Sequence, residues 1–438
     1  MTDTLELLRS GHLKGAKRLD LAAGLTEFPK EILALADSLE LLNLSDNHLK
    51  TLPDDFAQLQ NLKIVFFNHN DFETLPPVLA QCPQLYMISF KANRIQAIAA
   101  NALRPTVRWL TLTDNRLTQL PSTIGTLVNL QKLMLAGNQL RSLPAELANC
   151  QNLELIRLAA NQLTELPPWL FTLPRLSWLA YAGNPLCAKN AVVLPPLPLI
   201  DWHDLTPGDL LGQGASGLIY KGIWQNQTGI TEVAIKIFKG EITSDGFPGD
   251  EMQACMAAGS HPNLVTLLGK LINHPEQKDG LIFAFLPPTY NNLGGPPSLE
   301  TCTRDTYPAE TAFSLPVAHQ IAQGIASVTA HLHRQGILHG DLYAHNILVD
   351  AAGNGLLGDF GAASFYDSSD EKVAQSLERL EVRAFGCLLE DLLTRCSVTQ
   401  SVAETPIFDR LRQLQQECMK PIPTHRPRFN EICDRLSG

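Results

Sequence analysis

"LELLNLSDNHLKTLP", residues Leu39–Pro53, is a stretch that returns along the first half of the chain. It recurs as "VRWLTLTDNRLTQLP" (107–121), "LQKLMLAGNQLRSLP" (130–144) and "LELIRLAANQLTELP" (153–167), after a degenerate first copy at Leu19–Pro29. A fixed period of this kind indicates a repeat architecture. One asparagine per copy marks the period, with spacings of 22 or 23 residues: Asn47, Asn70, Asn93, Asn115, Asn138, Asn161 and Asn184.

The pattern LxxLxLxxNxL has a direct physical interpretation. The leucines of a short strand point into a core, and the asparagine turns the backbone out of the strand by bonding neighbouring main-chain groups. Each copy buries its apolar side only against its neighbours, so the copies form one continuous core. These motifs resemble the leucine-rich repeat family, which implies an α/β solenoid shaped like a horseshoe. We expect seven to eight copies of period 23 over residues 1–194.

One column of strand positions is apolar where side chains are expected to face outward. Its members are Leu41, Ile64, Met87, Trp109, Lys132, Leu155 and Trp178. The column can be half covered at the edge of the sheet. Alternatively, it is a docking surface for a protein substrate or regulator on the concave face, because contiguous exposed apolar patches commonly mark interaction sites.

Composition excludes several classes. The chain has 438 residues, of which 45% are hydrophobic and 18% charged, as in a folded protein. Residues 1–200 have a net charge of +1 and the remainder −11, without a basic stripe, so nucleic-acid binding is not expected.

The chain has nine cysteines without a CxxC pair, and neither a signal peptide nor a membrane span is expected. These features predict a cytoplasmic protein. A proline-rich linker is expected at 195–204, before a second domain at 205–438.

The second half opens with "LLGQGASGLIYKGIW", which holds a GxGxxG pattern at Gly212, Gly214 and Gly217. A dinucleotide-binding turn needs a helix directly after the glycines, whereas "LIYKGIW" is β-branched and aromatic and predicts a strand. A hairpin whose glycine tip covers phosphates fits better. "VAIKIF" then places Lys236 on an apolar strand, and a helix follows that carries Glu251, with Asp250 as the competing partner for Lys236.

The motifs "GQGASG", "VAIK", "HGDLYAHN" and "GDFG" follow one another in the order found in protein kinases, and over residues 205–438 the chain resembles that family. The resemblance implies a bilobal α+β protein-kinase-like domain that uses ATP and Mg²⁺. Lys236 and Glu251 would form an ion pair, and Asp341 would orient the substrate hydroxyl. Asn346 and Asp359 would be the Mg²⁺ ligands. The residues implied for nucleotide binding are Leu211, Gly212, Gly214, Gly217, Ile219, Lys236 and Leu286, with Phe283 as gatekeeper in the hinge "LIFAFLP".

Later motifs and several departures qualify the resemblance. "EVRAFGCLLEDLL" and "HRPRFNEI" resemble the later helices of tyrosine-kinase-like kinases. Gly340 stands where many kinases have Arg, and Tyr343 where Ser/Thr kinases have Lys. No APE motif follows Asp359, and the next helix is expected near Glu381, so the partner of Arg426 is open. A serine/threonine-directed protein kinase is favoured; a pseudokinase scaffold and a small-molecule kinase of aminoglycoside-phosphotransferase type are the alternatives.

Overall fold

The computed structural model describes residues 4–189, 194–226, 229–240, 242–396 and 406–438. Residues 190–193, which precede the predicted linker at 195–204, therefore lie outside the described residues. The chain divides into two compact units, Met1–Arg175 and Leu176–Gly438, which are described separately. The predicted boundaries at 194 and 205 stay a prediction.

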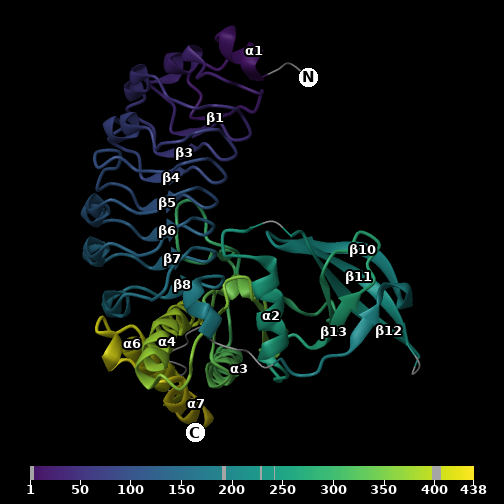
Figure 1. The fold of residues 1–438 in the computed structure, drawn as a ribbon. Helices are drawn as coiled ribbons and strands as arrows, with labels where there is room; N and C mark the ends of the chain where they lie inside the picture. The colour runs from purple at the N-terminus through teal and green to yellow at the C-terminus, as the bar shows by residue number, and fades with distance from the viewer. Residues whose placement is uncertain (1–3, 190–193, 227–228, 241, 397–405) are drawn as a thin grey trace. The chain divides into compact units, whose positions relative to one another are not determined.

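The first unit is a stack of short parallel strands (Figure 1), in which each strand pairs with the next in matching register. The central residue of each strand, such as Leu42 or Leu133, is fully buried. A short helix α1 (Thr4–Arg9) precedes the strands, which are β1 (Arg18–Asp20), β2 (Leu41–Asn43), β3 (Ile64–Phe66), β4 (Met87–Ser89), β5 (Trp109–Thr111), β6 (Lys132–Met134) and β7 (Leu155–Arg157). The return segments carry 3-10 helices: η1 (Lys30–Leu35), η2 (Asp54–Gln58), η3 (Pro77–Gln81), η4 (Ser122–Thr126), η5 (Ala145–Asn149) and η6 (Pro168–Thr172).

The repeated asparagines act as the spacing predicts. Asn70 is buried; its Nδ2 donates to the carbonyl of Leu44 at 2.9 Å in the preceding repeat, and its Oδ1 accepts from the amide of Leu49 at 2.9 Å. Asn138 repeats this pattern with Leu112 and Leu117. Each asparagine thus satisfies backbone groups that the turn leaves without strand partners. The solenoid prediction is confirmed.

Most members of the apolar column are buried. Met87 is 1% exposed, Leu155 2%, and Leu41 and Ile64 are also buried. Trp109 is half-buried, and the Nζ of Lys132 lies 3.9 Å from the centre of its ring. Trp178 is 1% exposed and belongs to the second unit, so its outward-facing position in the docking alternative is wrong for this residue.

The second unit begins with β8 (Trp178–Ala180), η7 (Pro185–Lys189), β9 (Leu199–Asp201) and η8 (Trp202–Asp204). Its larger sheet has the order β10-β11-β12-β14-β13-β9, so the end of the predicted linker, β9, is an edge strand. Helix α2 (Pro248–Ala258) follows β12 in the chain (Figure 1). The other strands of this sheet are β10 (Leu205–Gln213), β11 (Gly217–Asn226), β12 (Gly229–Phe238), β13 (Leu267–Ile272) and β14 (Gly280–Ala284). Since β11 follows the glycines directly, the predicted hairpin is confirmed.

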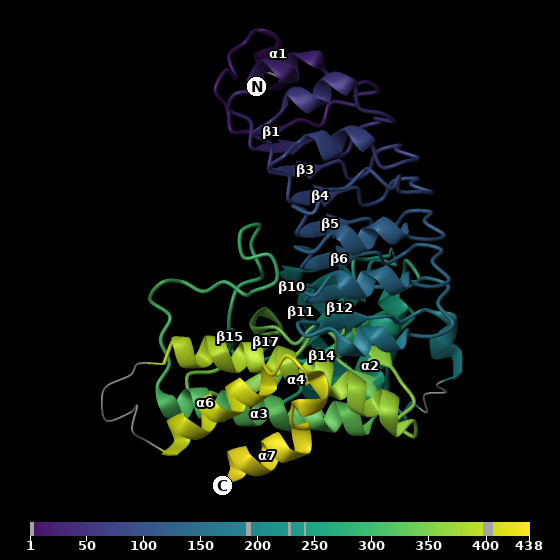
Figure 2. The ribbon, with the colours of Figure 1, turned by 90° about the vertical axis from the view of Figure 1, so that its left-hand side faces the viewer.

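Helices dominate the rest of the second unit (Figure 2). They are α3 (Leu315–Arg334), α4 (Glu371–Thr394), α6 (Pro406–Cys418) and α7 (Phe429–Ser437), with 3-10 turns η9 (Ala344–Asn346) and η10 (Pro423–His425). Short strands frame the loops between them: β15 (Asn291–Asn292), β16 (Ile337–Leu338), β17 (Ile347–Val349), β18 (Gly355–Leu357) and β19 (Ser364–Phe365). Within the described ranges, no helix is long and apolar enough to cross a bilayer.

The helix expected near Glu381 begins ten residues earlier, so that expectation is corrected. Helix α4 begins at Glu371, and the carboxylate of Asp370 caps it by accepting from the amide of Val373 at 3.1 Å. The segment that joins Asp359 to this helix is therefore even shorter than the sequence suggests.

Candidate active site

A cavity of about 560 Å³ lies in the second unit between the strands β10–β12, helix α2, the segment after β14 and the loop that follows β18; neither Asp341 nor Asn346 is among its lining residues. Most of its wall is apolar, from Ala234 on β12 and Leu348 on β17, and a few charged groups point into it. Mostly apolar walls with a few placed polar groups are typical of small-molecule and cofactor sites. Of the predicted nucleotide-binding residues, those that line the cavity are Leu211, Gly214, Gly217, Ile219, Lys236 and Leu286; Phe283 does so as well.

Gly212 is not among the lining residues, and Ala234, Leu348, Val265 and Phe285 line the cavity without having been predicted. The strand period gives a signal for Ala234. Because side chains alternate along a strand, Ala234 lies on the same face as Lys236, two residues away. Leu348 and Val265 come from segments without such a marker.

Lys236 forms an ion pair with Glu251 in the wall of the cavity. The pair is buried: the side chain of Glu251 is 1% exposed and that of Lys236 12%. Burial lowers the pKa of Lys236, but the charges of Glu251 and Asp359 outweigh it, and the pKa lies above its usual value. Glu251 rather than Asp250 is the partner, and burial raises the pKa of the Asp250 carboxyl. The cavity thus holds a fixed positive charge, suited to a phosphate.

Asp341 and Asn346 face each other across the loop of residues 339–346, which we call the catalytic loop. The Nδ2 of Asn346 donates to Oδ2 of Asp341 at 2.7 Å and to its carbonyl oxygen at 2.9 Å. The backbone amide of Gly358, next to Asp359, donates to the carbonyl of Asn346 at 3.0 Å. The loop therefore brings Asp341, Asn346 and the segment of Asp359 into one hydrogen-bonded group.

Asp359 lines the cavity in a left-handed backbone conformation, with φ of 51°. Non-glycine residues adopt this conformation rarely, and it concentrates at functional sites. Its Oδ1 accepts from the amide of Gly361 at 3.1 Å. Phe360 is buried, and its ring centre lies 5.2 Å from that of His339.

Asp359 and Asn346 offer the hard oxygen donors that Mg²⁺ prefers. Among the residues that the structure describes, no group of three or more His, Cys, Asp or Glu side chains could hold a metal by itself. This donor set fits a kinase-type Mg²⁺, which is bound by one or two protein oxygens and completed by phosphate oxygens.

The backbone of the catalytic loop is held by two carboxylates that the sequence did not single out for this role. Glu381 of α4 accepts from the amide of Gly340 at 2.7 Å and pairs with His333 at 3.0 Å. Burial by itself raises the pKa of the Glu381 carboxyl, but His333 and the amide of Gly340 lower it by more, so the pKa lies below its usual value. Glu381 lies in the motif "EVRAFG", which by itself predicts only a helix.

Asp305 holds the other end of the loop. Its carboxylate accepts from the amide of Ala344 at 2.7 Å and pairs with Nδ1 of His345 at 2.7 Å. Burial lowers the pKa of His345, yet this hydrogen bond and the charge of Asp341 raise it above its usual value. The imidazole of His345, beside the proposed catalytic carboxylate, therefore keeps its proton to a higher pH than a free histidine does.

The segment after Asp359 is packed rather than open. Ser364 and Phe365 form β19, which pairs with β16, and Ser364 is fully buried. The ring of Tyr366 is also buried, and its hydroxyl donates to the carbonyl of His333 at 3.0 Å. Four side chains in this segment carry a hydroxyl group that a kinase can phosphorylate: Ser364, Tyr366, Ser368 and Ser369. Of these four, only Ser368 and Ser369 are exposed.

Arg426, whose partner the sequence left open, binds backbone carbonyls. Its Nε donates to the carbonyl of Lys420 and its Nη1 to that of Arg379, both at 2.9 Å. Burial and the nearby charge of Arg383 lower its pKa to about 9.

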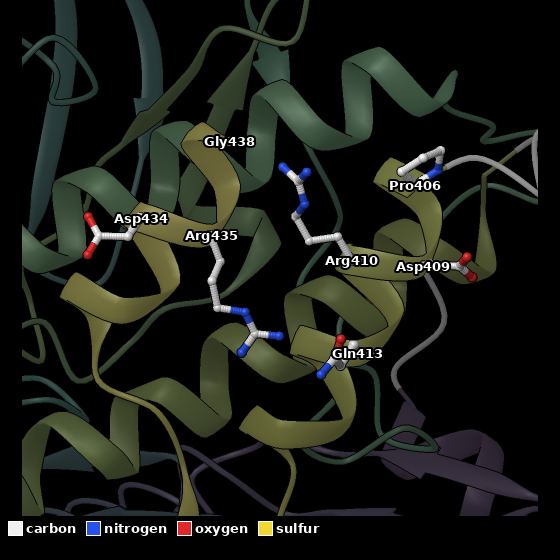
Figure 3. A pocket seen from close by; sticks show the side chains of 7 residues that line it. All are labelled: Pro406, Asp409, Arg410, Gln413, Asp434, Arg435 and Gly438. Carbon is white, nitrogen blue, oxygen red and sulfur yellow. The ribbon is translucent and has the colours of Figure 1, made fainter.

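A second cavity lies between α6 and α7 (Figure 3). Its charged lining is mixed, with Asp409, Arg410, Asp434 and Arg435, and Arg435 pairs with Glu417 at 2.7 Å. None of the proposed catalytic residues lines it.

Comparison with family models assigns both halves of the chain. Residues 205–397 match the model described as "Protein tyrosine and serine/threonine kinase". Residues 105–163 and 128–186 match one leucine-rich repeat model, and residues 38–59 match another. The chain is therefore a leucine-rich repeat protein with a protein kinase domain.

Two relatives that match the chain are also described as kinases. The chain is 29% identical over 287 residues to a protein of Acanthamoeba polyphaga mimivirus whose name describes a serine/threonine-protein kinase/receptor; this is 55% of the chain and 16% of that protein. It is 26% identical over 240 residues to the LRR receptor kinase SERK2 of rice, covering 48% of the chain and 37% of that protein. The chain thus spans well under half the length of these relatives.

Proposed function

We propose that the chain is an ATP- and Mg²⁺-dependent protein kinase, directed at serine or threonine, with its repeats as a docking module. The observation that carries the proposal is the buried Lys236–Glu251 pair in the same cavity as the carboxylate of Asp359. In phosphoryl transfer, catalysis consists almost entirely of positioning and of electrostatic stabilisation of the phosphates. A fixed cation and a carboxylate for the metal, in one apolar cavity, supply both.

Each residue has a separate task in this proposal. Lys236, held by Glu251, binds the α- and β-phosphates, and the glycine hairpin covers them. Asp359 and Asn346 would hold Mg²⁺, which would neutralise negative charge on the phosphates. Asp341 accepts the proton of the attacking hydroxyl, which bonds to the γ-phosphorus while the bond to ADP breaks.

The test measures phosphate transfer from γ-labelled ATP to protein, alongside calorimetric binding of MgATP. Replacing the general base in Asp341→Asn is expected to lower turnover about 10²- to 10⁴-fold and to keep MgATP binding. Asp359→Asn is expected to weaken MgATP binding as well, because it removes a metal ligand. Asp434→Asn, an exposed carboxylate on α7, is the control that keeps both properties. Turnover of Asp341→Asn within about tenfold of the parent would contradict the role of Asp341.

The short segment between Asp359 and α4 favours a second candidate, a small-molecule kinase. Without an APE segment, the chain lacks the platform on which protein kinases place a peptide. Assays with aminoglycosides beside protein substrates separate the two functions. A chain that binds MgATP and transfers phosphate to neither would instead be a pseudokinase scaffold.

A further inference from the structure

The segment Ser177–Tyr181, which contains β8 and the last position of the repeat column, lies against the catalytic loop within the second unit. The indole of Trp178 stacks on the ring of Tyr343, with centres 4.2 Å apart and planes 8° from parallel. The Nε1 of Trp178 donates to the carbonyl of Leu342 at 3.1 Å. Trp178 is 1% exposed and Tyr343 4%, so the contact is buried.

Gly340 marks the point where three segments meet. Its φ is +72°, and a Cβ placed there would lie 2.5 Å from the carbonyl oxygen of Leu179 and 2.8 Å from that of Ala362. Both the conformation and the space therefore require glycine. An arginine at this position, as in many kinases, would displace either the Ser177–Tyr181 segment or the segment after Asp359.

The same short segment reaches two further elements. The amide of Tyr181 donates to Oγ of Ser364 at 2.9 Å, and its hydroxyl donates to the carbonyl of Phe365 at 3.3 Å. The Nη1 of Arg383 on α4 donates to Oγ of Ser177 at 2.8 Å. Ser177–Tyr181 thus joins the catalytic loop, the segment after Asp359 and α4.

We propose that Trp178 is a positioning residue for phosphoryl transfer, and that Ser177–Tyr181 takes the place of a phosphorylated activation segment. This inference rests on the proposed kinase function. Trp178 holds the carbonyl group of Leu342, the residue after Asp341, while Glu381 holds the amide of Gly340, the residue before it. Asp341 is held from both sides, without a phosphate and without a receiving arginine.

Holding the loop, rather than blocking it, agrees with the exposure of the residues. The side chains of Trp178 and Tyr343 are buried, whereas Asp341 keeps part of its surface exposed. Asp341 also accepts from Asn346, the contact that links it to the metal-binding residues. The segment therefore supports the reactive group from behind.

The experiment uses the full chain and three substitutions. Trp178→Ala removes both the stack and the hydrogen bond, and is expected to lower kcat about 100-fold, as a misplacement of about 1 Å can do. Trp178→Phe keeps a ring on Tyr343 but loses the N–H, and is expected to lower kcat only about fivefold. The control is Trp169→Ala, a half-buried tryptophan in η6 of the first unit, which is expected to keep kcat. In all three, the KM for ATP and calorimetric MgATP binding are expected to stay within about twofold of the parent.

Each outcome supports or overturns the positioning role of Trp178. Unchanged kcat in Trp178→Ala overturns the proposal, and a raised kcat shows that the segment blocks the site. A fall in kcat together with lost MgATP binding shows a general structural role and also overturns it. If the parent chain transfers no phosphate, the proposed function fails on its own. Amide exchange of residues 339–346 then decides the positioning role: faster exchange in Trp178→Phe, with exchange in β11 unchanged, supports it, and equal exchange overturns it.

Discussion

The cavity wall and the catalytic loop of the second unit are built in different ways. Lys236 and Glu251, which form the charged wall, are separated by 15 residues and come from adjacent elements. The catalytic loop is held by Asp305, Glu381 and Trp178, which are 39, 41 and 164 residues away from the groups that they bind. Local motifs can specify binding chemistry, whereas the support of a loop is assembled from the whole domain.

The buried pair in the cavity wall offers the largest effect on stability. Glu251→Gln leaves Lys236 buried without its counter-charge, and breaking a buried pair in this way commonly costs about 3–5 kcal/mol of the free energy of unfolding. Adding Lys236→Met to Glu251→Gln is expected to recover most of this loss, because no uncompensated charge remains. Urea unfolding of the single and double variants measures the difference.

The matched control is the exposed pair Lys221–Glu232 on β11 and β12, whose side chains are 37% and 58% exposed. Surface pairs contribute about 0–1 kcal/mol, so Glu232→Gln is expected to change little. Equal costs for the two pairs would show that the cavity wall is solvated, and would remove the main argument for a nucleotide site.

This contrast explains which parts of the site can be predicted from sequence. The asparagine period predicts the solenoid because each copy repeats the same hydrogen bonds to its neighbour. The β-branched run after Gly217 predicts a strand, and hence the glycine hairpin. The start of α4 was missed although Asp370 is a regular helix-capping residue.

The contacts of Trp178 could not be predicted in the same way. Its position in the repeat column is equivalent to that of Trp109, and the pattern gave both tryptophans the same outward-facing role. Only the packing of the second unit shows that Trp178 is a buried neighbour of Tyr343. Glycine is likewise required at position 340 partly because the carbonyl of Leu179, which is distant in the chain, leaves no room for a side chain there.

Trp109 is the next test, because it is the tryptophan of the column that stays half-buried in the first unit. If the repeats dock a protein substrate, Trp109→Ala is expected to weaken its binding by about 2 kcal/mol, as truncation of aromatic anchors commonly does. The measurement is the KM for a protein substrate, with the KM for ATP unchanged. Trp169→Ala in η6, on the side away from the strands, is the control. A lowered melting temperature with an unchanged KM would make Trp109 ordinary packing.

The smallest effect on kcat is expected at the two exposed phosphorylation sites after Asp359, Ser368 and Ser369. Phosphorylation here adds about −1.5 to −2 charges. In this chain the neighbours are Asp367, Asp370 and Glu371, and Gly340 provides no side chain to receive the phosphate. Ser364 and Tyr366 are buried and hydrogen-bonded, so a modifying enzyme can reach only Ser368 and Ser369 without local unfolding.

The double variant Ser368→Ala/Ser369→Ala is therefore expected to keep its kcat within about twofold, as surface substitutions usually do. Phosphatase treatment of the parent chain is expected to change nothing either. Ser364→Ala is the informative contrast, because it removes the hydroxyl that accepts from the amide of Tyr181 and is expected to lower kcat in the direction of the Trp178 variants. A large loss of activity in the double variant, with none in Ser364→Ala, would show that the loop is ordered by phosphorylation after all. The packed segment Ser177–Tyr181 would then not be what holds Asp341 in position.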